Sequence, residues 1–359
     1  MKAGAGILVD RSHKIKAPHV TRTTPNLLHE SPMNSLCLTV ALAALLQVEN
    51  PEREVGIWVL TTEGEVKFQD RGEILYTLMG YPREDEVVVL NLVNLEDTAV
   101  RDDDLSRLEG LKDLRRLELN RTAISDDGLR HIAGLSTLQK LYLEKTKITD
   151  DGLKHLSKLT KLEDLDLSGT AVTGERLAEI ALLKKLRRLD LKATPLTDEG
   201  LAHVKSLTRL RQLDLAETPL RGEGLTHVSS LEKLDGLWLQ RSKISVDSWP
   251  HLEKLKELRW LNLDATSVND AALKHLTGMK RMSKLYLRNT SITDDGLAHV
   301  SSFDRIRELW LTDTDVTDAG ISHLKKLKSL YLLNVARTKI SEAGANELRK
   351  SLPETSVVR

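Results

Sequence analysis

Leucine and other apolar residues recur along most of this chain in the spacing L-x-x-L-x-L-x-x-T-x-I, followed by a polar turn and a G-L-x-x-I-x-x-L segment. The arrangement repeats every 24 residues, without insertion or deletion, through eleven copies. The first positions of the copies are Leu90, Leu114, Leu138, Leu162, Leu186, Leu210, Leu234, Leu258, Met282, Ile306 and Leu330. A fixed period of this length predicts a solenoid, in which each copy stacks on the next.

Each copy carries the pattern of one strand and one short helix. In the second copy, residues 117–119 alternate between apolar and polar, which predicts a strand with one buried face. Residues 128–132 follow with apolar side chains three apart, which is helical spacing. We therefore expect a parallel sheet along one face and helices along the other. The ninth position is Thr or Ser in every copy, and its hydroxyl is expected to bond to backbone groups at the bend after the strand.

The consensus L-x-x-L-x-L-x-x-T-x-I-T-D-x-G-L-x-H-L resembles the bacterial leucine-rich repeats of the ribonuclease-inhibitor-like class, and it is similar to the repeats of F-box adaptors. The resemblance covers residues 87 to 359. It implies an α/β solenoid: a curved right-handed superhelix with a parallel sheet on the concave face and short helices on the convex face. It also implies a protein-binding scaffold, without naming the partner.

Segments at both ends are expected to flank the repeats, which occupy residues 87–340. Residues 341–359 are predicted to form a C-terminal cap with a helix and a partial strand, and residues 1–50 a disordered leader. Within the leader, the apolar run 36–46 is shorter than the roughly 20 residues that span a bilayer. It fits either a signal-peptide core or a buried helix that docks on the first repeat, so both a cytoplasmic and an exported location stay open.

Residues 51–86 are predicted to cap the first repeat. The apolar run 55–60, a turn containing Gly64 and the segment 65–68 indicate a β-hairpin. Such a hairpin would cover the open edge of the first repeat, whose unpaired backbone would otherwise recruit another chain.

The third and fifth positions of each copy point away from the leucine core and into the concave surface. Because neighbouring strands lie about 4.8 Å apart, Trp238, Trp260, Tyr286 and Trp310 are expected to form one patch. Trp and Tyr dominate binding hot spots, so we predict that this patch anchors a partner, with room for a ring or a ligand beside Gly236. The alternative is that these rings pack on one another. The charged residues expected around the patch are Asp214, Arg241, Asp264, Arg288, Glu308 and Asp313.

Histidine and aspartate recur on the same period. Eight histidines, from His131 to His323, share one register, and six of them follow an acid by four residues, which favours helix ion pairs over a metal site. A run of aspartates on the sheet face is interpreted as a self-paired surface rather than a cation site. The aspartates and the arginines expected to face them are Asp166, Asp190, Asp214, Arg187, Arg188 and Arg211.

Composition and motifs narrow the function classes. The chain has 53 Lys and Arg against 53 Asp and Glu, a balance that argues against a nucleic-acid surface. A single cysteine, Cys37, rules out disulfide-stapled ends and a cysteine metal motif. Motifs of zinc peptidases, serine hydrolases and phosphate-binding loops are absent from the sequence. We therefore predict no catalytic residue, no cofactor and no metal site.

These observations predict a monomeric, non-enzymatic scaffold without a membrane span, which binds a protein or peptide on its concave sheet. One alternative is an F-box-like ubiquitin-ligase substrate adaptor, although residues 1–86 show no convincing F-box pattern. Another is a protein that binds carbohydrate or a small molecule. Catalysis in that setting would need paired carboxylates such as Asp214 and Asp264.

Overall fold

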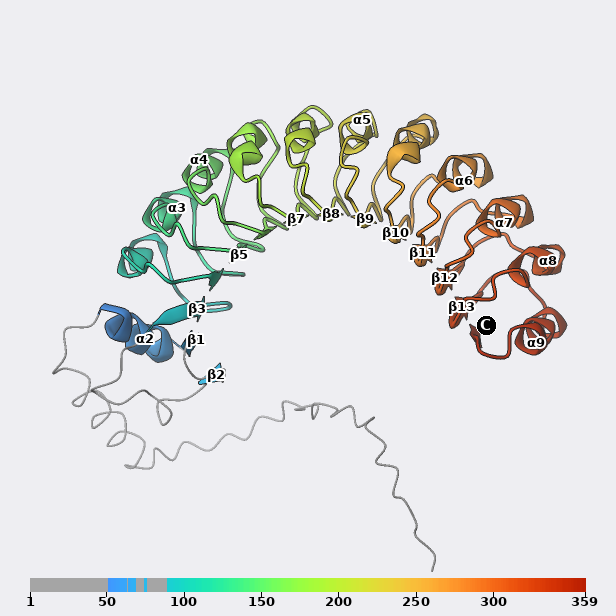
Figure 1. Ribbon diagram of the computed structural model, residues 1–359, viewed down its shortest axis with the longest axis horizontal. Helices are drawn as coiled ribbons and strands as arrows, with labels where there is room; N and C mark the ends of the chain where they lie inside the picture. The colour runs from blue at the N-terminus through green and yellow to red at the C-terminus, as the bar shows by residue number, and fades with distance from the viewer. Residues whose placement is uncertain (1–50, 63, 69–73, 76–88) are drawn as a thin grey trace, which may run out of the picture.

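The computed structural model describes residues 51–62, 64–68, 74–75 and 89–359. Over the repeats, strands and helical segments alternate along one curved array (Figure 1). The predicted leader, residues 1–50, lies outside the described residues together with its apolar run at 36–46.

Fourteen strands of the described residues form a single sheet, which lines the inner side of the arc (Figure 1). The repeats supply β3 (Leu90–Asn94), β4 (Arg116–Glu118), β5 (Lys140–Tyr142), β6 (Asp164–Asp166), β7 (Arg188–Asp190), β8 (Gln212–Asp214), β9 (Gly236–Trp238), β10 (Trp260–Asn262), β11 (Lys284–Tyr286), β12 (Glu308–Trp310) and β13 (Leu332–Asn334), and the C-terminal segment supplies β14 (Ser356–Val358). These strands are parallel and lie in chain order. The parallel concave sheet predicted from the repeat is thereby confirmed.

The strand register repeats the period of the sequence. Leu117 of β4 pairs with Leu141 of β5, and Leu141 pairs with Leu165 of β6, each 24 residues further along. From β4 to β13 the middle residue of every strand is a buried leucine. Because side chains alternate along a strand, the residues before and after that leucine lie on the concave face.

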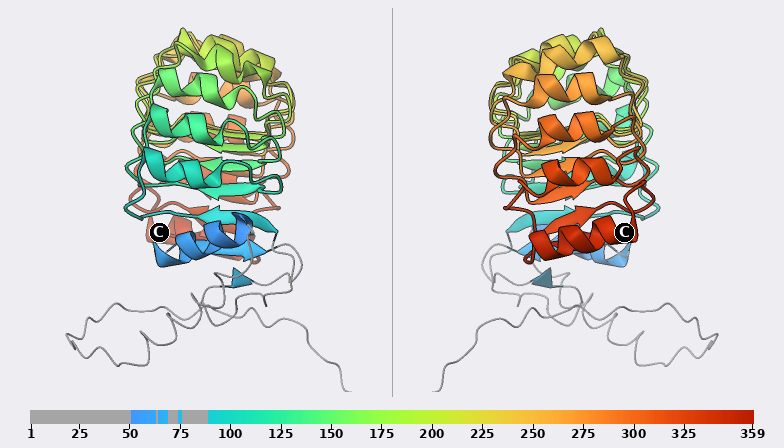
Figure 2. Two further views of the ribbon diagram at one scale, coloured as in Figure 1. Left: turned by 90° about the vertical axis from the view of Figure 1, so that its left-hand side faces the viewer. Right: turned by 90° about the vertical axis from the view of Figure 1, so that its right-hand side faces the viewer.

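Helical segments cover the outer side of the arc (Figures 1 and 2). They are η3 (Asp102–Leu108), α3 (Asp126–Ile132), η4 (Asp150–Gly152), α4 (Leu153–Leu156), η5 (Leu177–Leu182), η6 (Gly200–Ser206), α5 (Leu225–Val228), η7 (Val246–Lys254), α6 (Asp270–Leu276), α7 (Asp294–Val300), η8 (Asp318–Gly320), α8 (Ile321–Leu324) and α9 (Glu342–Ser351). The segments labelled η are 3₁₀ helices, which rise faster per residue than α-helices.

Stacked leucines fill the space between the sheet and the helical segments. In the second copy, Leu114, Leu117 and Leu119 are fully buried, and the equivalent residues of the other repeats form one continuous core with them. Two rings replace leucines of the pattern, Trp249 in η7 and Phe303 in the loop after α7, and both are buried. Each copy buries its leucines only against its neighbours, so the stability of the array is a sum over interfaces.

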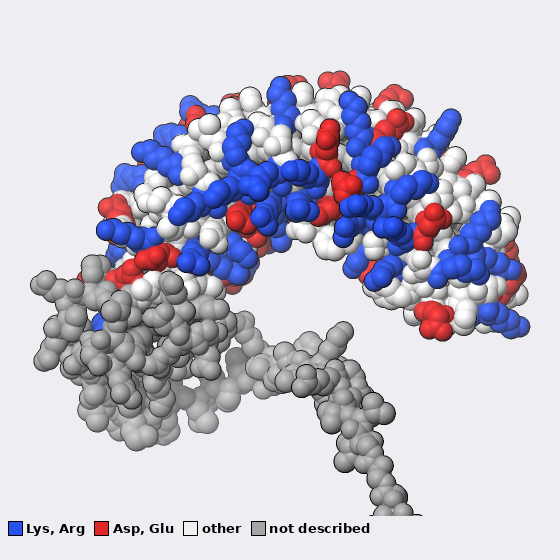
Figure 3. Space-filling model, in the orientation of Figure 1, with Lys and Arg blue, Asp and Glu red and all other residues white. Residues whose placement is uncertain are grey.

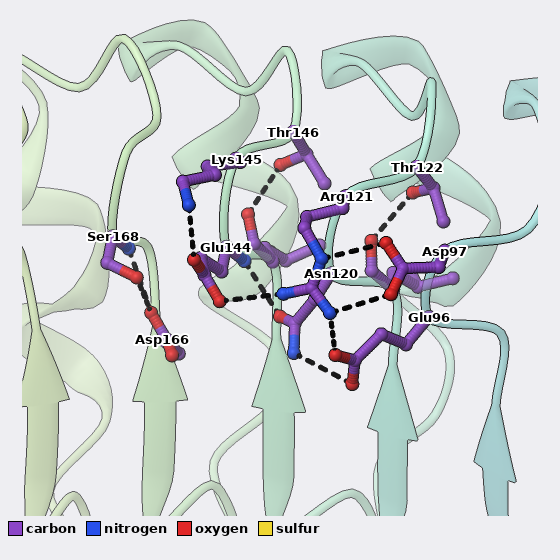
Figure 4. A network of polar contacts seen from close by, with 12 residues as sticks. Glu96, Asp97, Asn120, Arg121, Thr122, Glu144, Lys145, Thr146, Asp166 and Ser168 are labelled. Atoms are coloured by element: carbon purple, nitrogen blue, oxygen red, sulfur yellow. Dashed lines mark hydrogen bonds and ion pairs between the residues drawn. The ribbon is translucent and has the colours of Figure 1, made fainter. Parts of the chain in front are cut away.

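The bend after each strand is held by the hydroxyl of the ninth position. Thr122 donates a hydrogen bond of 2.7 Å to the carbonyl of Leu119, and Thr146 makes the same bond to Leu143 (Figure 4). All eleven copies, including the one with Ser242, contain this bond. The prediction for this residue is confirmed. The residue before it adopts a positive φ in every copy, as at Arg121 with 54°, which turns the chain toward the outer side.

The N-terminal segment differs from the predicted hairpin. Residues 55–60 belong to a helix, α2 (Pro51–Thr61), and the prediction of a strand there is wrong. Pro51 occupies the first helical position and Glu52 and Glu54 lie in the first turn, which favours a helix. A short apolar run does not distinguish a buried strand from a buried helix, and Val55 and Val59, four residues apart, are both buried.

Strands at both ends extend the sheet beyond the repeats. β1 (Glu65–Phe68) pairs antiparallel with β3 and with β2 (Ile74–Leu75), so it covers the backbone edge of the first repeat. At the other end, α9 is followed by β14, which pairs in parallel with β13 through Leu333 and Val357. The helix and the partial strand expected in the C-terminal segment are both present.

Candidate functional site

Four aromatic side chains lie on four adjacent strands of the concave face. Trp238 ends β9, Trp260 begins β10, Tyr286 ends β11 and Trp310 ends β12. Trp260 is 38% exposed, and the other three rings are half-buried. The structure therefore brings together the aromatic residues singled out in the sequence, and none of them lies in the leucine core. We call these four residues the aromatic patch.

The rings of the aromatic patch pack in two pairs. Trp238 and Trp260 meet edge to face, with ring centroids 6.3 Å apart and an angle of 62° between the planes. Tyr286 and Trp310 are stacked, with centroids 6.0 Å apart and an angle of 25°. Such pairs contribute roughly 0.5–1.5 kcal/mol beyond the area they bury. The rings thus pack on one another, as the alternative interpretation predicted, while they remain partly exposed to solvent.

Gly236 provides space for the first pair. A Cβ atom on this glycine would lie 2.7 Å from Cη2 and 2.8 Å from Cζ3 of Trp238. The space that the sequence analysis left for a ring or ligand beside Trp260 is therefore occupied by the indole of Trp238. A glycine at this position of β9 is what allows that indole to lie so close to the backbone of residue 236.

Arg288 and Asp264 brace the second pair. The guanidinium carbon of Arg288 lies 5.1 Å from the centroid of the Trp310 ring and 5.9 Å from that of Tyr286, within the range of cation–π attraction. Asp264 is buried, and its carboxylate accepts hydrogen bonds from the backbone N–H and from Nε of Arg288, both at 2.7 Å. A buried carboxylate thus holds the arginine against the stacked rings.

Glu308 fixes the phenol end of the same pair. Its buried carboxylate accepts hydrogen bonds from the hydroxyl of Tyr286 at 2.9 Å and from the hydroxyl of Tyr331, and it pairs with Lys284 at 2.7 Å. Burial alone would raise the pKa of Glu308, but hydrogen bonds from Lys284, Tyr331 and Tyr286 bring it below its usual range. Burial and the bond to Glu308 raise the pKa of Tyr286, so its hydroxyl stays a donor.

The other charged residues of the predicted rim lie further from the rings. Asp214 pairs in register with Trp238, and both line a concave hollow of about 440 Å³. Arg241 and Asp313 lie at the positive-φ positions of the turns after β9 and β12. Of the six charged residues predicted there, Arg288 and Glu308 thus contact the patch, Asp264 holds Arg288, and Asp214 borders the patch. Arg241 and Asp313 flank it.

Two aspartates of the run on β6 to β8, Asp190 and Asp214, have raised pKa values. Burial raises the pKa of Asp190 to about 7, and the neighbouring carboxylates of Asp214 and Asp166 add to the shift. Burial raises the pKa of Asp214 as well. Among the residues predicted to face this run, Arg188 lies 3.6 Å from Asp190.

The other two arginines expected at this run have different partners. Arg187 pairs with Glu163 at 3.4 Å, and Arg211 pairs with Asp235 at 3.4 Å. Both occupy the second position of their copies, so they lie at the beginning of the strands rather than on the sheet face. The prediction that they face the aspartates is wrong for this reason.

The histidines that pair with acids do so between repeats. Nδ1 of His131 lies 2.5 Å from the carboxylate of Glu109, and His275 makes the same contact with Glu253. The acid of the predicted helix pair, Asp127, is not the partner of His131, because stacking places the end of the preceding helical segment beside the ring. These two histidines thus connect copies, and the partner predicted for His131 is wrong.

A polar network crosses the turns of the first three copies (Figure 4). Arg121 donates from Nε and Nη2 to Asp97, both at 2.8 Å, and from Nη1 to Glu144 at 3.1 Å. Its Nη2 also contacts Glu96. One arginine therefore links the turns of three successive repeats. This network, which the sequence pattern did not indicate, pairs each of the three carboxylates with Arg121 and joins the repeats at this end.

A groove that was not predicted from the sequence lies at the edge of the sheet where β10 to β13 begin. The groove has a volume of about 840 Å³, and it shares Trp260 with the aromatic patch. Its basic residues are Arg259, Arg281, Lys284, Arg305 and Arg307. We call it the basic groove. Four of these residues occupy the last or the second position of their copies. A comparison of these two positions along the repeats would have indicated the cluster, even though the net charge of the chain is zero.

The described part of the chain lacks two features. Within it, no group of three or more His, Cys, Asp or Glu side chains is arranged to hold a metal ion. Nor do the described helices include one that is both long and apolar enough to cross a membrane.

Comparisons with known proteins agree with this architecture. A family model described as a leucine-rich repeat region matches residues 141–339. An internalin from Listeria monocytogenes has a similar fold, with a TM-score of 0.51 and 18% identity over 76% of this chain and 89% of that chain. At such low identity the similarity concerns the fold. No curated protein matches the sequence.

Two further solved structures overlap with the array more loosely. A leucine-rich repeat protein from Leptospira interrogans has a TM-score of 0.46 and 18% identity, over 74% of this chain and 82% of that chain. A plant peptide hormone receptor in complex with RGF2 has a TM-score of 0.46 and 16% identity, over 81% of this chain and 51% of that chain.

Proposed function

Because the chain belongs to the leucine-rich repeat family, whose arrays are protein-interaction scaffolds, we propose that its concave face binds a protein or peptide partner through the aromatic patch. The observation that carries this proposal is the gathering of Trp238, Trp260, Tyr286 and Trp310 on four adjacent strands, outside the core and partly exposed. Trp and Tyr are the residues most enriched where binding energy concentrates.

The aromatic patch is held in place before any partner arrives. The buried carboxylates of Asp264 and Glu308 fix Arg288 and Tyr286, and the rings pack in pairs. Side chains that are already ordered lose little conformational entropy on binding, which removes a cost of about 0.5–1.5 kcal/mol for each side chain that would otherwise be immobilised. A rigid sheet supports these groups, so the partner meets a preformed surface.

The test is to isolate a partner and then to measure its affinity. Proteins captured from the source organism by the immobilised chain are identified, purified and titrated against the wild type and against the double variant Trp238→Ala/Trp260→Ala. We expect the double variant to weaken binding by at least 100-fold while its circular dichroism spectrum is unchanged. Undiminished affinity in the folded double variant would refute a role for the patch.

A matched control lies on the same face, outside the patch. Tyr142 ends β5, and its hydroxyl bonds to Asp164 at 2.9 Å, so it resembles Tyr286 in position and in contacts. The variant Tyr142→Ala should bind the partner with wild-type affinity. Equal losses in Tyr142→Ala and in the double variant would indicate a general disturbance of the sheet.

The alternatives from the sequence stay predictions. No contact in the described residues favours an F-box-like adaptor or a carbohydrate-binding or small-molecule-binding protein. Of the carboxylates named for a catalytic version, Asp264 is bound to Arg288 through both oxygens.

A further inference from the structure

The basic groove concentrates positive charge at one edge of a chain whose net charge is zero. Its lining contains five Lys or Arg side chains and a single acid, Glu308. Figure 3 shows Lys and Arg gathered along the edge of the arc that faces the viewer. Clefts lined by one sign of charge focus the electric field and attract ligands of the opposite sign.

Three arginines of the groove have no acidic partner among the residues that the structure describes. Lys284 pairs with Glu308, and Arg281 pairs with Glu257. In the described part of the chain, Arg259, Arg305 and Arg307 form no salt bridge, and all three are exposed. Arg259 and Arg307 occupy the second position of copies two strands apart, which places their backbones roughly 10 Å from each other. The groove therefore presents three unpaired guanidinium groups, close enough together for a few residues of an extended peptide to contact all of them.

The groove continues into the aromatic patch. Trp260 belongs to both, and Nζ of Lys284 lies 5.8 Å from the centroid of its ring. On the other side, Tyr331 is 51% exposed and contributes an aromatic surface beside the arginines. A ligand that spans both regions would contact the rings of the aromatic patch at one end. At the other end it would contact guanidinium groups beside the phenol ring of Tyr331.

We propose that the basic groove binds an acidic segment of the peptide or protein that docks on the aromatic patch, an inference that rests on the proposed function. The planar guanidinium groups of Arg259, Arg305 and Arg307 match the geometry of carboxylates and form paired hydrogen bonds with them. The partner therefore carries several Asp or Glu side chains next to the apolar or aromatic residues that contact Trp260.

The distribution of salt bridges favours an acidic peptide over a nucleic acid. A nucleic-acid backbone needs a continuous track of unpaired cations for its regularly spaced phosphates. Between the unpaired lysines and arginines of this edge, Arg187, Arg211 and Arg281 are each paired with a carboxylate of a neighbouring copy, so the unpaired cations do not form one continuous track. The unpaired arginines and the aromatic rings meet over a few repeats, which suits a short segment of polypeptide.

The experiment measures fluorescence anisotropy with a fluorescein-labelled copolymer of glutamate and tyrosine as the probe. We expect the full-length protein to bind this copolymer, to bind it less tightly as salt rises, and to ignore a lysine–tyrosine copolymer. The triple variant Arg259→Ala/Arg305→Ala/Arg307→Ala should weaken binding by at least 10-fold. The variant with lysine at the same positions keeps the charge but not the paired hydrogen bonds, so it should recover only part of the affinity.

A matched triple variant distinguishes the effect of the groove arginines from the effect of a lower net charge. Lys185, Arg209 and Lys233 are exposed on the same edge, and in the described residues they form no salt bridge. Their replacement by alanine removes the same charge and should change the affinity less than twofold. Equal weakening in both triple variants, absence of binding to the copolymer, or tighter binding of a single-stranded oligonucleotide would overturn the proposal.

A further variant distinguishes this inference from the proposed function. Trp310 belongs to the aromatic patch but does not line the groove. For the partner isolated by capture, Trp310→Ala tests the patch and the arginine triple variant tests the groove. If only Trp310→Ala weakens binding, the groove proposal fails and the proposed function stands. If only the arginine variant does, the patch is refuted and the groove stands.

Discussion

The carboxylate of Asp126 accepts two hydrogen bonds from Thr149, one repeat later: one from its backbone N–H at 2.9 Å and one from its hydroxyl at 2.6 Å. Thr149 in turn accepts from the backbone N–H of Asp151 and caps the helical segment that follows. The same aspartate-to-hydroxyl bond links other neighbouring copies. The pairs are Asp102 with Ser125, Asp150 with Thr173, Asp270 with Thr293 and Asp294 with Thr317.

Removing one of these links should destabilise the array. Asp126→Ala leaves the partly buried N–H and hydroxyl of Thr149 without their acceptor. We therefore expect a loss of about 1–3 kcal/mol in the free energy of unfolding. Urea denaturation followed by circular dichroism measures this loss. The adjacent Asp127 is exposed, so Asp127→Ala should leave the urea midpoint nearly unchanged. Similar losses in both variants would show that the link contributes nothing specific.

The repeat made much of this structure predictable. Because the period is fixed, the position of one strand determines the register of all the others, as the pairing of Leu117 with Leu141 shows. The role of the recurrent hydroxyl was predictable because every turn leaves a backbone carbonyl that needs a hydrogen-bond donor, as Thr122 provides for Leu119. The aromatic patch followed from the same register, since strand alternation fixes which side chains face inward.

Features that depend on single side chains could not be derived from the pattern. The apolar run 55–60 is compatible with a strand or a helix, and its helical state depends on burial of Val55 and Val59. The partners of Arg187 and Arg211 depend on which rotamers reach a neighbouring copy, the preceding one for Arg187 and the following one for Arg211. The basic groove escaped notice because a balanced total charge does not reveal how charges are divided between the two edges of the sheet.

The pair of Asp264 and Arg288, in which the carboxylate is buried, should matter more for stability than a pair whose carboxylate lies in solvent. Asp264→Ala removes three contacts with Arg288, at 2.6 Å to 2.7 Å, and leaves the arginine unrestrained beside Trp310. We expect a loss of about 1–3 kcal/mol in the free energy of unfolding. Asp313 and Arg337 form a two-bond pair of 2.6 Å at an exposed turn. Asp313→Ala should therefore shift the urea midpoint far less, and the opposite ranking would contradict this account.

Gly236 should be required for the geometry of the aromatic patch. In Gly236→Ala the new methyl group would lie 2.7 Å from Trp238, so the indole must move away from Trp260. We expect the near-ultraviolet circular dichroism of the tryptophans to change, and partner affinity to fall by about tenfold. In the control Gly134→Ala, the added methyl meets no atom within 4 Å. An unchanged spectrum for Gly236→Ala would mean that the indole pair is not held as described.

Asp190 should make stability depend on pH. Burial raises its pKa from 3.8 to about 7, so between these values the folded protein retains a proton that the unfolded chain releases. The folded state binds more protons in this interval, and stability therefore falls as pH rises from about 4 to about 7. Asp190→Asn removes the charge but keeps an oxygen to accept the hydrogen bond from the backbone N–H of Lys192. The variant should match the wild type near pH 4 and exceed it by about 1–3 kcal/mol at pH 8. Urea denaturation at both pH values measures the free energy of unfolding of the variant and the wild type, with Asp127→Asn at an exposed position as the control. If the two proteins differed by the same free energy at both pH values, the assignment to Asp190 would be contradicted.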